Sequence, residues 1–416
     1  SVSVSTNSEI TTSPDGITWT YRGAPWKPNG YGGTNIGGLI SAKNFCFGGS
    51  KFIGCAFGSV ITSVDGINWN SLNTGSVANL NSVASNGNVT VAVGEYSFNQ
   101  FNPKTLKPTI LSSADGNSWN HSNTNGLTAY SLSKFYDVIW TGTRFIAAGG
   151  GVNQSTSGVL IATSTDGVNW STQVDTNTNY YVSKLASIGN TVISDMNLNS
   201  FDGGLTWAYQ TGDNSYGMNI ATSPTQFLKI YNRLQSNNPA TWTYFVGSDG
   251  INWTSRTFPY TALGYNADVS FYSARWCNDR YILSGAAFVP ITNVNNVVQY
   301  IQKGKIWYST DGINWSEASG FNYQTNVYVP PYFYDSCYAF GKFYVVGQNA
   351  LWTSSDGVTF SEIKSVSNPS LNEYSGKNMG SGFGTLLKIT NSNNKLIAVG
   401  NGGLVVTSPR PTTVSI

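Results

Sequence analysis

Short apolar runs separated by polar turns recur along the whole chain, and their lengths are those of strands. Runs such as YDVIW (136–140) and SCYAF (336–340) precede a turn that contains glycine. A second run that ends in small residues follows, as in GTRFIAAGG (142–150) and GKFYVVG (341–347). Apolar runs of about four to eight residues between turn signals are typical of buried strands. Helical periodicity is nowhere convincing, so the pattern predicts an all-β protein.

An Asp-Gly turn followed closely by an aromatic residue recurs eight times. Its aspartates are separated by 36 to 62 residues and are Asp15, Asp65, Asp115, Asp166, Asp202, Asp249, Asp311 and Asp356. Asp-Gly between two apolar runs favours a hairpin, because glycine tolerates positive φ and aspartate accepts N–H bonds within its own turn. We expect a turn between antiparallel strands, with the aromatic residue that follows, usually tryptophan, buried against the next repeat.

Each repeat therefore reads strand, short turn, strand, variable loop, strand, Asp-Gly turn, strand. Four-stranded antiparallel sheets that repeat at this spacing form the blades of a closed β-propeller. We predict one such domain over residues 1–416. The C-terminal stretch 386–409 supplies the first strands of a repeat, and residues 8–20 supply only the last ones. We expect N- and C-terminal strands to close the ring, with eight blades, or seven if the terminal strands lie outside it.

The repeated pattern SxDGxxW resembles the Asp box, or BNR repeat, of sialidases and other β-propellers. SFDGGLTW (200–207) fits the fuller form SxDxGxTW at every fixed position. The resemblance implies a fold rather than an activity, because Asp boxes occur in sialidases, other glycoside hydrolases, lectins, sorting receptors and assembly factors. It places the boxes between the third and fourth strands, away from the active face, so we interpret the eight aspartates as turn formers.

Composition limits the partners. Charged residues make up 10% of the chain, the net charge is +2, and no run of lysine or arginine occurs, so a nucleic-acid binder is excluded. Aromatic residues make up 14%, which together with the strand pattern argues against disorder. No transmembrane run, signal peptide or transit peptide is visible, and we expect no membrane insertion. A surface rich in Asn, Ser, Thr, Gly and Tyr suits an extracellular or virion-surface protein.

Catalytic patterns are sparse, and we assign no catalytic residue, metal site or cofactor. The one histidine, His121, follows a box and is expected in an exposed turn. The segment 376–384 has the glycines of a phosphate loop but lacks GK[ST]. Resemblance to sialidases implies an arginine triad, a tyrosine nucleophile paired with glutamate and an aspartate acid/base. Only YRGAP (21–25) partly resembles their FRIP-like motif. Whether the protein is an enzyme therefore stays open, and the sequence favours a protein that is not one.

The four cysteines lack CxxC spacing. Cys46 and Cys337 occupy matching positions in the first strands of two repeats, which predicts small buried core residues. A Cys46–Cys55 bridge across one hairpin is an open alternative.

The long loops predict where binding occurs. Length variation is concentrated in the connections between second and third strands and between repeats, at 21–35, 95–108, 258–272, 288–305 and 321–336. Variable loops on a rigid scaffold usually carry binding. Their aromatic rings could cover a sugar face, or could pack on each other or on a neighbouring subunit. The candidate ligand-binding residues are Trp26, Tyr31, Tyr96, Tyr180, Tyr181, Tyr260, Tyr265, Tyr323, Tyr328, Tyr332 and Tyr334.

These features favour a non-catalytic protein that recognises a cell-surface glycan or receptor through the long-loop face. Its composition is similar to that of phage tail-fibre or receptor-binding proteins and bacterial adhesins. One alternative is a structural or protein-interaction module of a larger virion or surface assembly. Another is a sialidase-like glycoside hydrolase, for which two carboxylates about 5–10 Å apart would be the signature.

Overall fold

The computed structural model describes twenty-one stretches of the chain. They are residues 10–12, 19–23, 44–56, 59–65, 70–73, 78–97, 106–122, 133–153, 156–175, 181–210, 218–235, 238, 242–259, 268–292, 298–321, 332–347, 350–363, 366–367, 386–392, 395–400 and 405–409. These stretches contain strands and turns and no α-helix.

The chain divides into two compact units. Unit 1 comprises Ser1–Ile10, Arg22–Tyr216 and Asn401–Gly403, and unit 2 comprises Thr11–Tyr21, Gly217–Gly400 and Leu404–Ile416.

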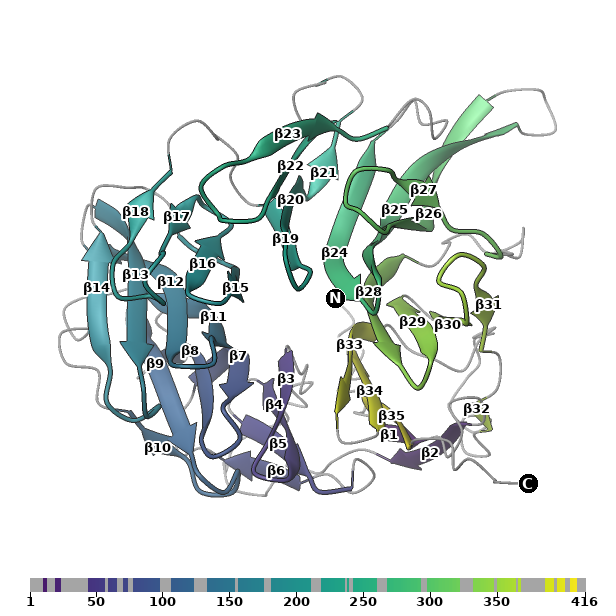
Figure 1. Cartoon of the computed structure of the whole chain (residues 1–416). Helices are drawn as coiled ribbons and strands as arrows, with labels where there is room; N and C mark the ends of the chain where they lie inside the picture. The colour runs from purple at the N-terminus through teal and green to yellow at the C-terminus, as the bar shows by residue number, and fades with distance from the viewer. Residues whose placement is uncertain are drawn as a thin grey trace, which may run out of the picture. The chain divides into compact units, whose positions relative to one another are not determined.

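Unit 1 contains three four-stranded antiparallel sheets and two short two-stranded sheets (Figure 1). The four-stranded sheets are β3 (Asn44–Gly48), β4 (Lys51–Ala56), β5 (Ser59–Ser63) and β6 (Asn70–Asn73); β7 (Ala78–Ser85), β8 (Thr90–Ser97), β9 (Leu106–Ser113) and β10 (Asn120–His121); and β11 (Lys134–Trp140), β12 (Phe145–Asn153), β13 (Thr156–Ser164) and β14 (Ser171–Asp175). The two-stranded sheets are β15 (Leu185–Ile188) with β16 (Thr191–Ser194), and β17 (Leu198–Asn199) with β18 (Ala208–Tyr209).

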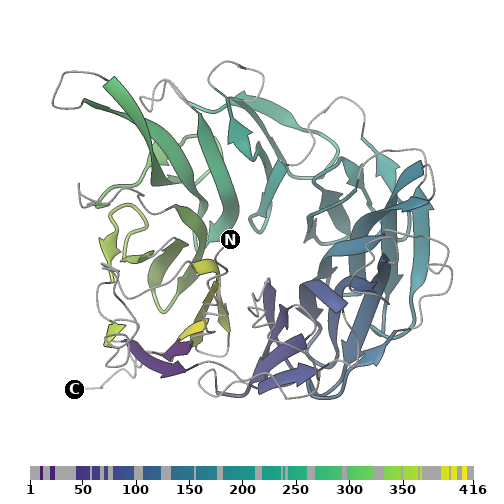
Figure 2. The same ribbon diagram turned by 180° about the vertical axis from the view of Figure 1, so that it is seen from behind.

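Unit 2 contains sheets of four, five, four and six strands. The first three are β19 (Met218–Thr222), β20 (Phe227–Tyr231), β22 (Thr243–Gly247) and β23 (Thr254–Thr257); β21 (Arg233–Leu234), β24 (Val269–Cys277), β25 (Arg280–Thr292), β26 (Val298–Ser309) and β27 (Ser316–Glu317); and β28 (Phe333–Ala339), β29 (Lys342–Gly347), β30 (Ala350–Ser354) and β31 (Ser361–Glu362). The long β25–β26 hairpin extends past the other strands of its sheet in both views (Figure 1, Figure 2).

The six-stranded sheet brings together strands from both ends of the chain. Its order is β32 (Val366–Ser367), β2 (Trp19–Gly23), β1 (Ile10–Thr12), β35 (Val405–Pro409), β34 (Lys395–Gly400) and β33 (Leu386–Ser392). The N-terminal β1 therefore lies beside the C-terminal β35, and β32 pairs with β2 in parallel.

The first strands of successive sheets lie side by side within each unit. In unit 1, β3 contacts β7, β7 contacts β11, and β11 contacts β15. In unit 2, β19 contacts β24, β24 contacts β28, and β28 contacts β33. Consecutive antiparallel sheets joined through their first strands are the construction of a β-propeller. The prediction of an all-β propeller fold with antiparallel sheets is therefore confirmed.

The sheet count differs from the eight, or alternatively seven, blades expected. The described residues contain six sheets of four or five strands. After β16, the tight turn at Asp195–Asn197 leads into strands of only two residues, so β15–β16 and β17–β18 form separate sheets linked by the Val192–Ser200 bridge. The terminal strands merge into the six-stranded sheet instead of a four-stranded one.

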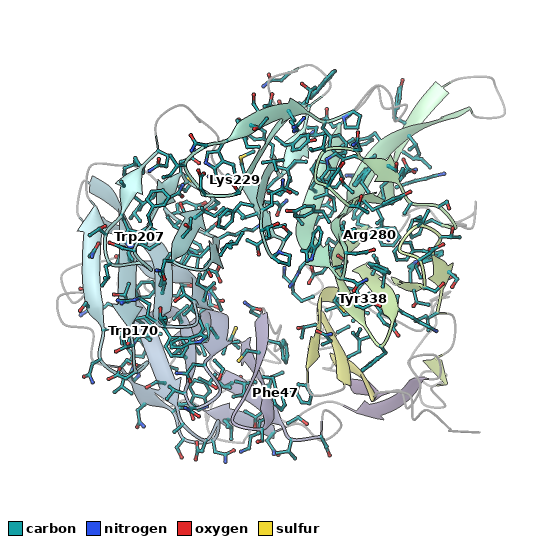
Figure 3. The ribbon with its side chains drawn as sticks, viewed as in Figure 1. Phe47, Trp170, Trp207, Lys229, Arg280 and Tyr338 are labelled. Carbon is teal, nitrogen blue, oxygen red and sulfur yellow. The ribbon has the colours of Figure 1, made fainter. Side chains whose placement is uncertain are left out.

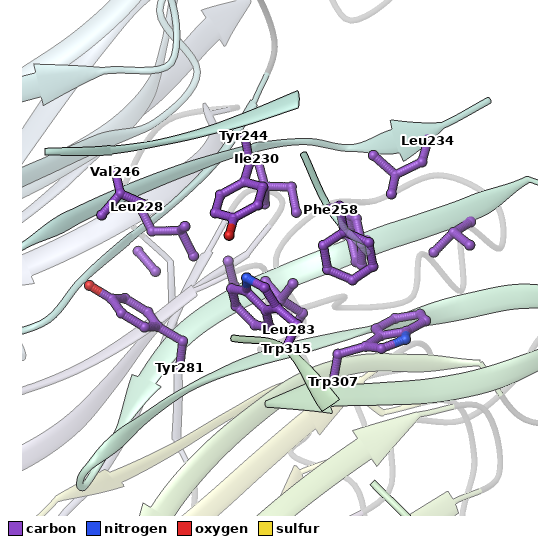
Figure 4. Close-up of a cluster of buried hydrophobic side chains, with 14 of the residues drawn as sticks. Leu228, Ile230, Leu234, Tyr244, Val246, Phe258, Tyr281, Leu283, Trp307 and Trp315 are labelled. Atoms are coloured by element: carbon purple, nitrogen blue, oxygen red, sulfur yellow. The ribbon is translucent and has the colours of Figure 1, made fainter. Parts of the chain in front are cut away.

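Aromatic side chains fill the space between neighbouring sheets. In the largest cluster of unit 2, Tyr244 and Phe258 pack against Trp307 and Trp315 (Figure 4). The Phe258 and Trp307 rings meet edge to face at 6.3 Å, and Trp307 is fully buried. Such pairs add stability beyond the area they bury, which ties consecutive sheets together.

In the six sheets of four or five strands, the Asp-Gly turn lies between the last two strands, as predicted. In the turn between β9 and β10, Asp115 Oδ1 accepts the backbone N–H groups of Asn117 and Ser118 at 2.8 Å and the Ser113 hydroxyl at 3.1 Å. The Ser118 and Asn117 N–H bonds lower the pKa of Asp115 to about 2. Gly116 has φ of 71°, which explains the glycine.

The turn tryptophans Trp119, Trp170, Trp207 and Trp315 pack toward the preceding repeat and not, as expected, toward the next one. Trp315 meets Tyr244 of the preceding sheet edge to face at 6.2 Å. Trp170 clusters with Val91 and Ile110 of the preceding sheet, and lies in unit 1 with its counterpart Trp207 (Figure 3). The Trp170 indole N–H donates to the glycine carbonyl of its own turn at 3.1 Å, whereas the buried Trp315 indole N–H has no partner among the described residues.

The four cysteines are free thiols. Cys46 in β3 and Cys337 in β28 occupy first strands, as predicted, and Cys277 in β24 does too. The alternative of a Cys46–Cys55 disulfide is wrong, because Cys46 lies opposite Ile53 and Cys55 lies opposite Asn44 in the β3–β4 pair.

Candidate ligand-binding site

A repeated tripeptide opens three of the first strands. It is Phe-Tyr-Asp at 135–137, Phe-Tyr-Ser at 271–273 and Phe-Tyr-Asp at 333–335. In all three, the strand pairing shifts register across the tyrosine, which marks a β-bulge. A bulge bends the strand and redirects the side chain of the extra residue.

A glycine on the second strand makes each bulge possible. The phenylalanine of the tripeptide pairs with Gly149, Gly285 or Gly347. A Cβ on these glycines would lie 1.9–2.0 Å from a backbone carbonyl oxygen just before the bulge. This close backbone approach explains why the second apolar run of each repeat ends in glycine.

The three residues of the tripeptide have different surroundings. The phenylalanines are at most 2% exposed and belong to the core, whereas Tyr272 is 37% exposed. First strands begin where the chain arrives from the previous sheet. The tyrosines therefore lie at the end of each sheet that carries the long connections.

The third residue links neighbouring sheets. Asp335 is fully buried and accepts the Ser273 hydroxyl at 2.7 Å, the Arg275 guanidinium at 2.8 and 3.0 Å, and the Ile389 N–H at 3.1 Å. Burial favours the neutral acid, yet the Arg275 guanidinium holds the pKa of Asp335 below its ordinary value.

Asp137 has the same role in unit 1 without an arginine. It accepts the Ser82 hydroxyl at 2.8 Å and the Leu185 N–H at 3.0 Å, which join the preceding and following sheets. Burial raises the pKa of Asp137, and the nearby Asp195 carboxylate raises it further. Asp195 is 2% exposed, accepts N–H bonds from Ser183 and Lys184, and also has a pKa raised by burial.

Tyrosines from two neighbouring sheets meet in unit 2, in what we call the Tyr272 cluster (Tyr272, Tyr332 and Tyr334). Ring centres are 5.2 Å apart for Tyr272–Tyr334, 6.3 Å for Tyr272–Tyr332 and 6.5 Å for Tyr332–Tyr334. Partial burial raises the pKa of Tyr272 and Tyr334, so both hydroxyls are protonated and able to donate at neutral pH. Near the start of β24, Asp268 forms an ion pair with Arg233 of the adjacent strand β21.

A second aromatic group lies at the matching place in unit 1. Tyr136 stacks on Tyr181 with ring centres 4.8 Å apart and planes at 22°, and Tyr181 is 52% exposed. The Lys134 ammonium lies 4.8 Å from the centre of the Tyr136 ring and 3.7 Å from Glu95 Oε2.

Three of the predicted ligand-binding residues, Tyr181, Tyr332 and Tyr334, fall in these groups. Tyr96 instead meets the exposed His121 edge to face at 6.0 Å, and packs within its own sheet. The remaining candidates lie outside the described residues: Trp26, Tyr31, Tyr180, Tyr260, Tyr265, Tyr323 and Tyr328.

Sequence reasoning missed Tyr136, Tyr272 and the buried aspartates. The signal was present in the repeated Phe-Tyr-Asp/Ser tripeptide, which places an acid or serine inside an apolar run. An acidic residue in such a run needs partners to be buried, and thereby marks an inter-sheet contact.

Three arginines are already engaged by separate carboxylates: Arg233 by Asp268, Arg275 by Asp335 and Arg280 by Asp279. Within the stretches that the structure describes, no three His, Cys, Asp or Glu side chains are grouped to hold a metal ion. The same stretches contain no helix long and apolar enough to cross a membrane.

Comparison with known proteins supports the fold alone. No protein-family model and no curated protein sequence matches the chain. The computationally designed Ika8 protein aligns with a TM-score of 0.51 and 11% identity over 88% of this chain and 95% of its own. An ancestral GH74 enzyme has a TM-score of 0.42 and 14% identity over 88% and 59% of the two chains. The sialidase of Trypanosoma rangeli has a TM-score of 0.38 and 12% identity over 86% and 57%.

Proposed function

We propose that the protein binds a surface glycan, without cleaving it, through the tyrosines at the first-strand ends of its sheets. The observation that carries this proposal is the Tyr272 cluster. It places three rings from two sheets around one point, with Tyr272 37% exposed. Tyrosines placed in this way offer flat apolar faces together with protonated hydroxyls.

The cluster suits a sugar for physical reasons. The C–H face of a pyranose is apolar and its rim carries hydroxyls, so a tyrosine ring covers the face while neighbouring polar groups bond the rim. The first strands of the two sheets are in contact, so their tyrosine rings are held in place before a ligand binds. This reduces the conformational entropy lost on binding. The bulges at Tyr272 and Tyr334 serve this purpose.

The rest of the architecture belongs to the same proposal. We place eight blades in the ring, with seven as the alternative, counting β15–β18 as one blade and the six-stranded sheet as another. Pairing of β1 with β35 supports closure by the two chain ends. The turn geometry around Asp115 supports the assignment of Asp boxes. A weakly charged, tyrosine-rich chain of this kind suits an adhesin or a phage receptor-binding protein exposed at a virion or cell surface.

A glycoside hydrolase is the second candidate, and Asp137 with Asp195 favours it. Both carboxyl groups have pKa values raised by burial, as a general acid requires. Both are also held by N–H and hydroxyl donors of their own chain. These bonds support a structural role, for which we rank hydrolysis below binding.

An interaction module is the third candidate. The residue after the turn glycine is an exposed aliphatic side chain in four repeats: Val168 at 45%, Leu205 at 50%, Ile251 at 52% and Ile313 at 38%. Exposed apolar side chains at equivalent positions favour contact with another protein.

A glycan-array screen of the purified chain tests the proposal, with release of reducing sugar measured for every glycan that binds. We expect binding without release. Release of reducing sugar would establish the hydrolase. The absence of both binding on the array and release of sugar would favour the interaction module.

A further inference from the structure

We propose that Glu95, Lys134, Tyr136 and Tyr181 form a second sugar site in unit 1, selective for uncharged sugars. This inference rests on the proposed function and gives the ligand class. It comes from a carboxylate oxygen that accepts no hydrogen bond from the described residues and lies near a partly exposed aromatic stack.

Glu95 lies near the end of β8, and its side chain is only 12% exposed. Its Oε1 accepts the Asn79 side-chain amide at 2.7 Å. Its Oε2 is buried and has no hydrogen-bond partner among the described residues. The Lys134 ammonium is 3.7 Å away, close enough to balance the charge but too far for a hydrogen bond.

A buried carboxylate oxygen without a donor is costly, and a ligand hydroxyl would remove that cost. Such an oxygen accepts and cannot donate, so it selects a ligand that offers O–H or N–H groups. The lysine beside it can donate to a second ligand oxygen. Together the two groups match neighbouring hydroxyls on a sugar ring.

The aromatic part of the site comes from β11 and from the segment before β15. Tyr136 is the bulge residue of β11, and Tyr181 stacks on it from the segment before β15. Gly150 permits this approach, because a Cβ there would lie 2.3 Å from Tyr181 Cβ. Tyr181 is 52% exposed, which leaves ring surface for a ligand.

Charge decides between sugar classes. Lys134 and Glu95 together are neutral, and the atom without a hydrogen-bond partner among the described residues belongs to the carboxylate. A sugar carboxylate at this position would be repelled by Glu95, whereas an uncharged sugar gains a charge-assisted hydrogen bond. We therefore expect neutral hexoses, and not sialic acid, at this site.

Saturation-transfer difference NMR on the full chain tests the site, with the methyl glycosides of galactose, glucose, mannose and N-acetylglucosamine, and with N-acetylneuraminic acid. Glu95→Gln keeps the shape and the contact with Asn79 but puts an amide NH₂ in place of Oε2. Glu362→Gln, on the outer strand β31, is its control. Tyr181→Ala is matched by Tyr209→Ala, since Tyr209 is an exposed tyrosine on β18.

We expect at least one neutral glycoside to bind, and its affinity to fall about tenfold or more in Glu95→Gln and Tyr181→Ala but not in the controls. Lys134→Met should weaken binding too, and serves if Glu95→Gln fails to fold. Neutral-sugar binding that persists in both site variants but is lost in Tyr334→Ala would overturn this inference and leave the proposed function standing. Binding of none of the sugars, together with a silent glycan array, would overturn both.

Discussion

At the residue scale, buried acids hold the inner strands together. Asp137 and Asp335 each accept a serine hydroxyl from the preceding sheet and a backbone N–H from the following one. The two aspartates make the same links but differ in pKa. The Arg275 guanidinium lowers the pKa of Asp335, whereas burial raises the pKa of Asp137. A carboxylate that is fully bonded joins three sheets through one side chain.

Arg275→Met should destabilise the protein by about 3 kcal/mol or more at pH 7, because it removes the guanidinium that is bonded to the fully buried Asp335. Without the guanidinium, the folded-state pKa of Asp335 rises above the unfolded value. The deficit should therefore shrink as the pH falls through that raised pKa. Urea unfolding at several pH values measures this, with Arg275→Met/Asp335→Asn as the rescue variant. A deficit that is constant with pH and not rescued would contradict the ion-pair role.

The turn aspartates stabilise the protein through a lowered pKa, so their contribution is also lost as the pH falls, but in a lower pH range. The folded pKa of Asp115, and that of Asp356, is lowered to about 2 by backbone N–H bonds. Their stabilisation is complete above the unfolded pKa of about 3.9 and is lost as the pH falls through about 2. The stability difference between wild type and Asp115→Asn should thus vanish between about pH 4 and pH 2. An unchanged difference down to pH 2 would mean that the charge of Asp115 does not contribute.

At the element scale, the β-bulge redirects a tyrosine of the first strand, and we propose that this tyrosine then contacts the ligand. The bulge needs glycine on the partner strand, and it turns the tyrosine out while keeping the phenylalanine in the core. The strand periodicity and the Asp-Gly turns were predictable from sequence, because both depend on local spacing. The bulge was not, since it depends on which carbonyl lies opposite Gly347, a contact between strands.

Gly347→Ala tests the bulge. Its Cβ would lie 1.9 Å from the Tyr332 carbonyl oxygen, so β28 must shift. We expect a loss of about 1–3 kcal/mol in stability and weaker glycan binding, because Tyr332 and Tyr334 move with the strand. Gly149→Ala should have the same effect on stability in unit 1. Denaturation curves and glycan affinity unchanged in both variants would show that the bulges do not need glycine.

At the scale of the whole molecule, the two chain ends share one sheet. Pairing of β1 with β35 was predictable from the incomplete repeats at 8–20 and 386–409. The predicted regular blades were not all found, because β17 and β18 are too short to join β15–β16 in one sheet. Loop position drew attention to Tyr332 and Tyr334, which lie in the Tyr272 cluster. It could not distinguish Tyr181, which stacks on Tyr136 from another segment, from Tyr96, which packs on His121 of its own sheet.

Deleting residues 1–20 should lower the melting temperature by several degrees, because β1 and part of β2 would be lost and β35 would become an edge strand. Differential scanning calorimetry measures the effect. A melting temperature equal to that of the full chain would place these strands outside the cooperative fold.

We propose that bulge tyrosines contact a glycan, and the dissociation constant of an array-selected glycan is the most direct test. Isothermal titration calorimetry would compare wild type with Tyr272→Ala, and with Tyr209→Ala as the control for loss of an exposed ring. We expect binding about tenfold weaker in Tyr272→Ala, at an unchanged melting temperature, and no change in the control. Equal affinity in wild type and Tyr272→Ala would contradict it.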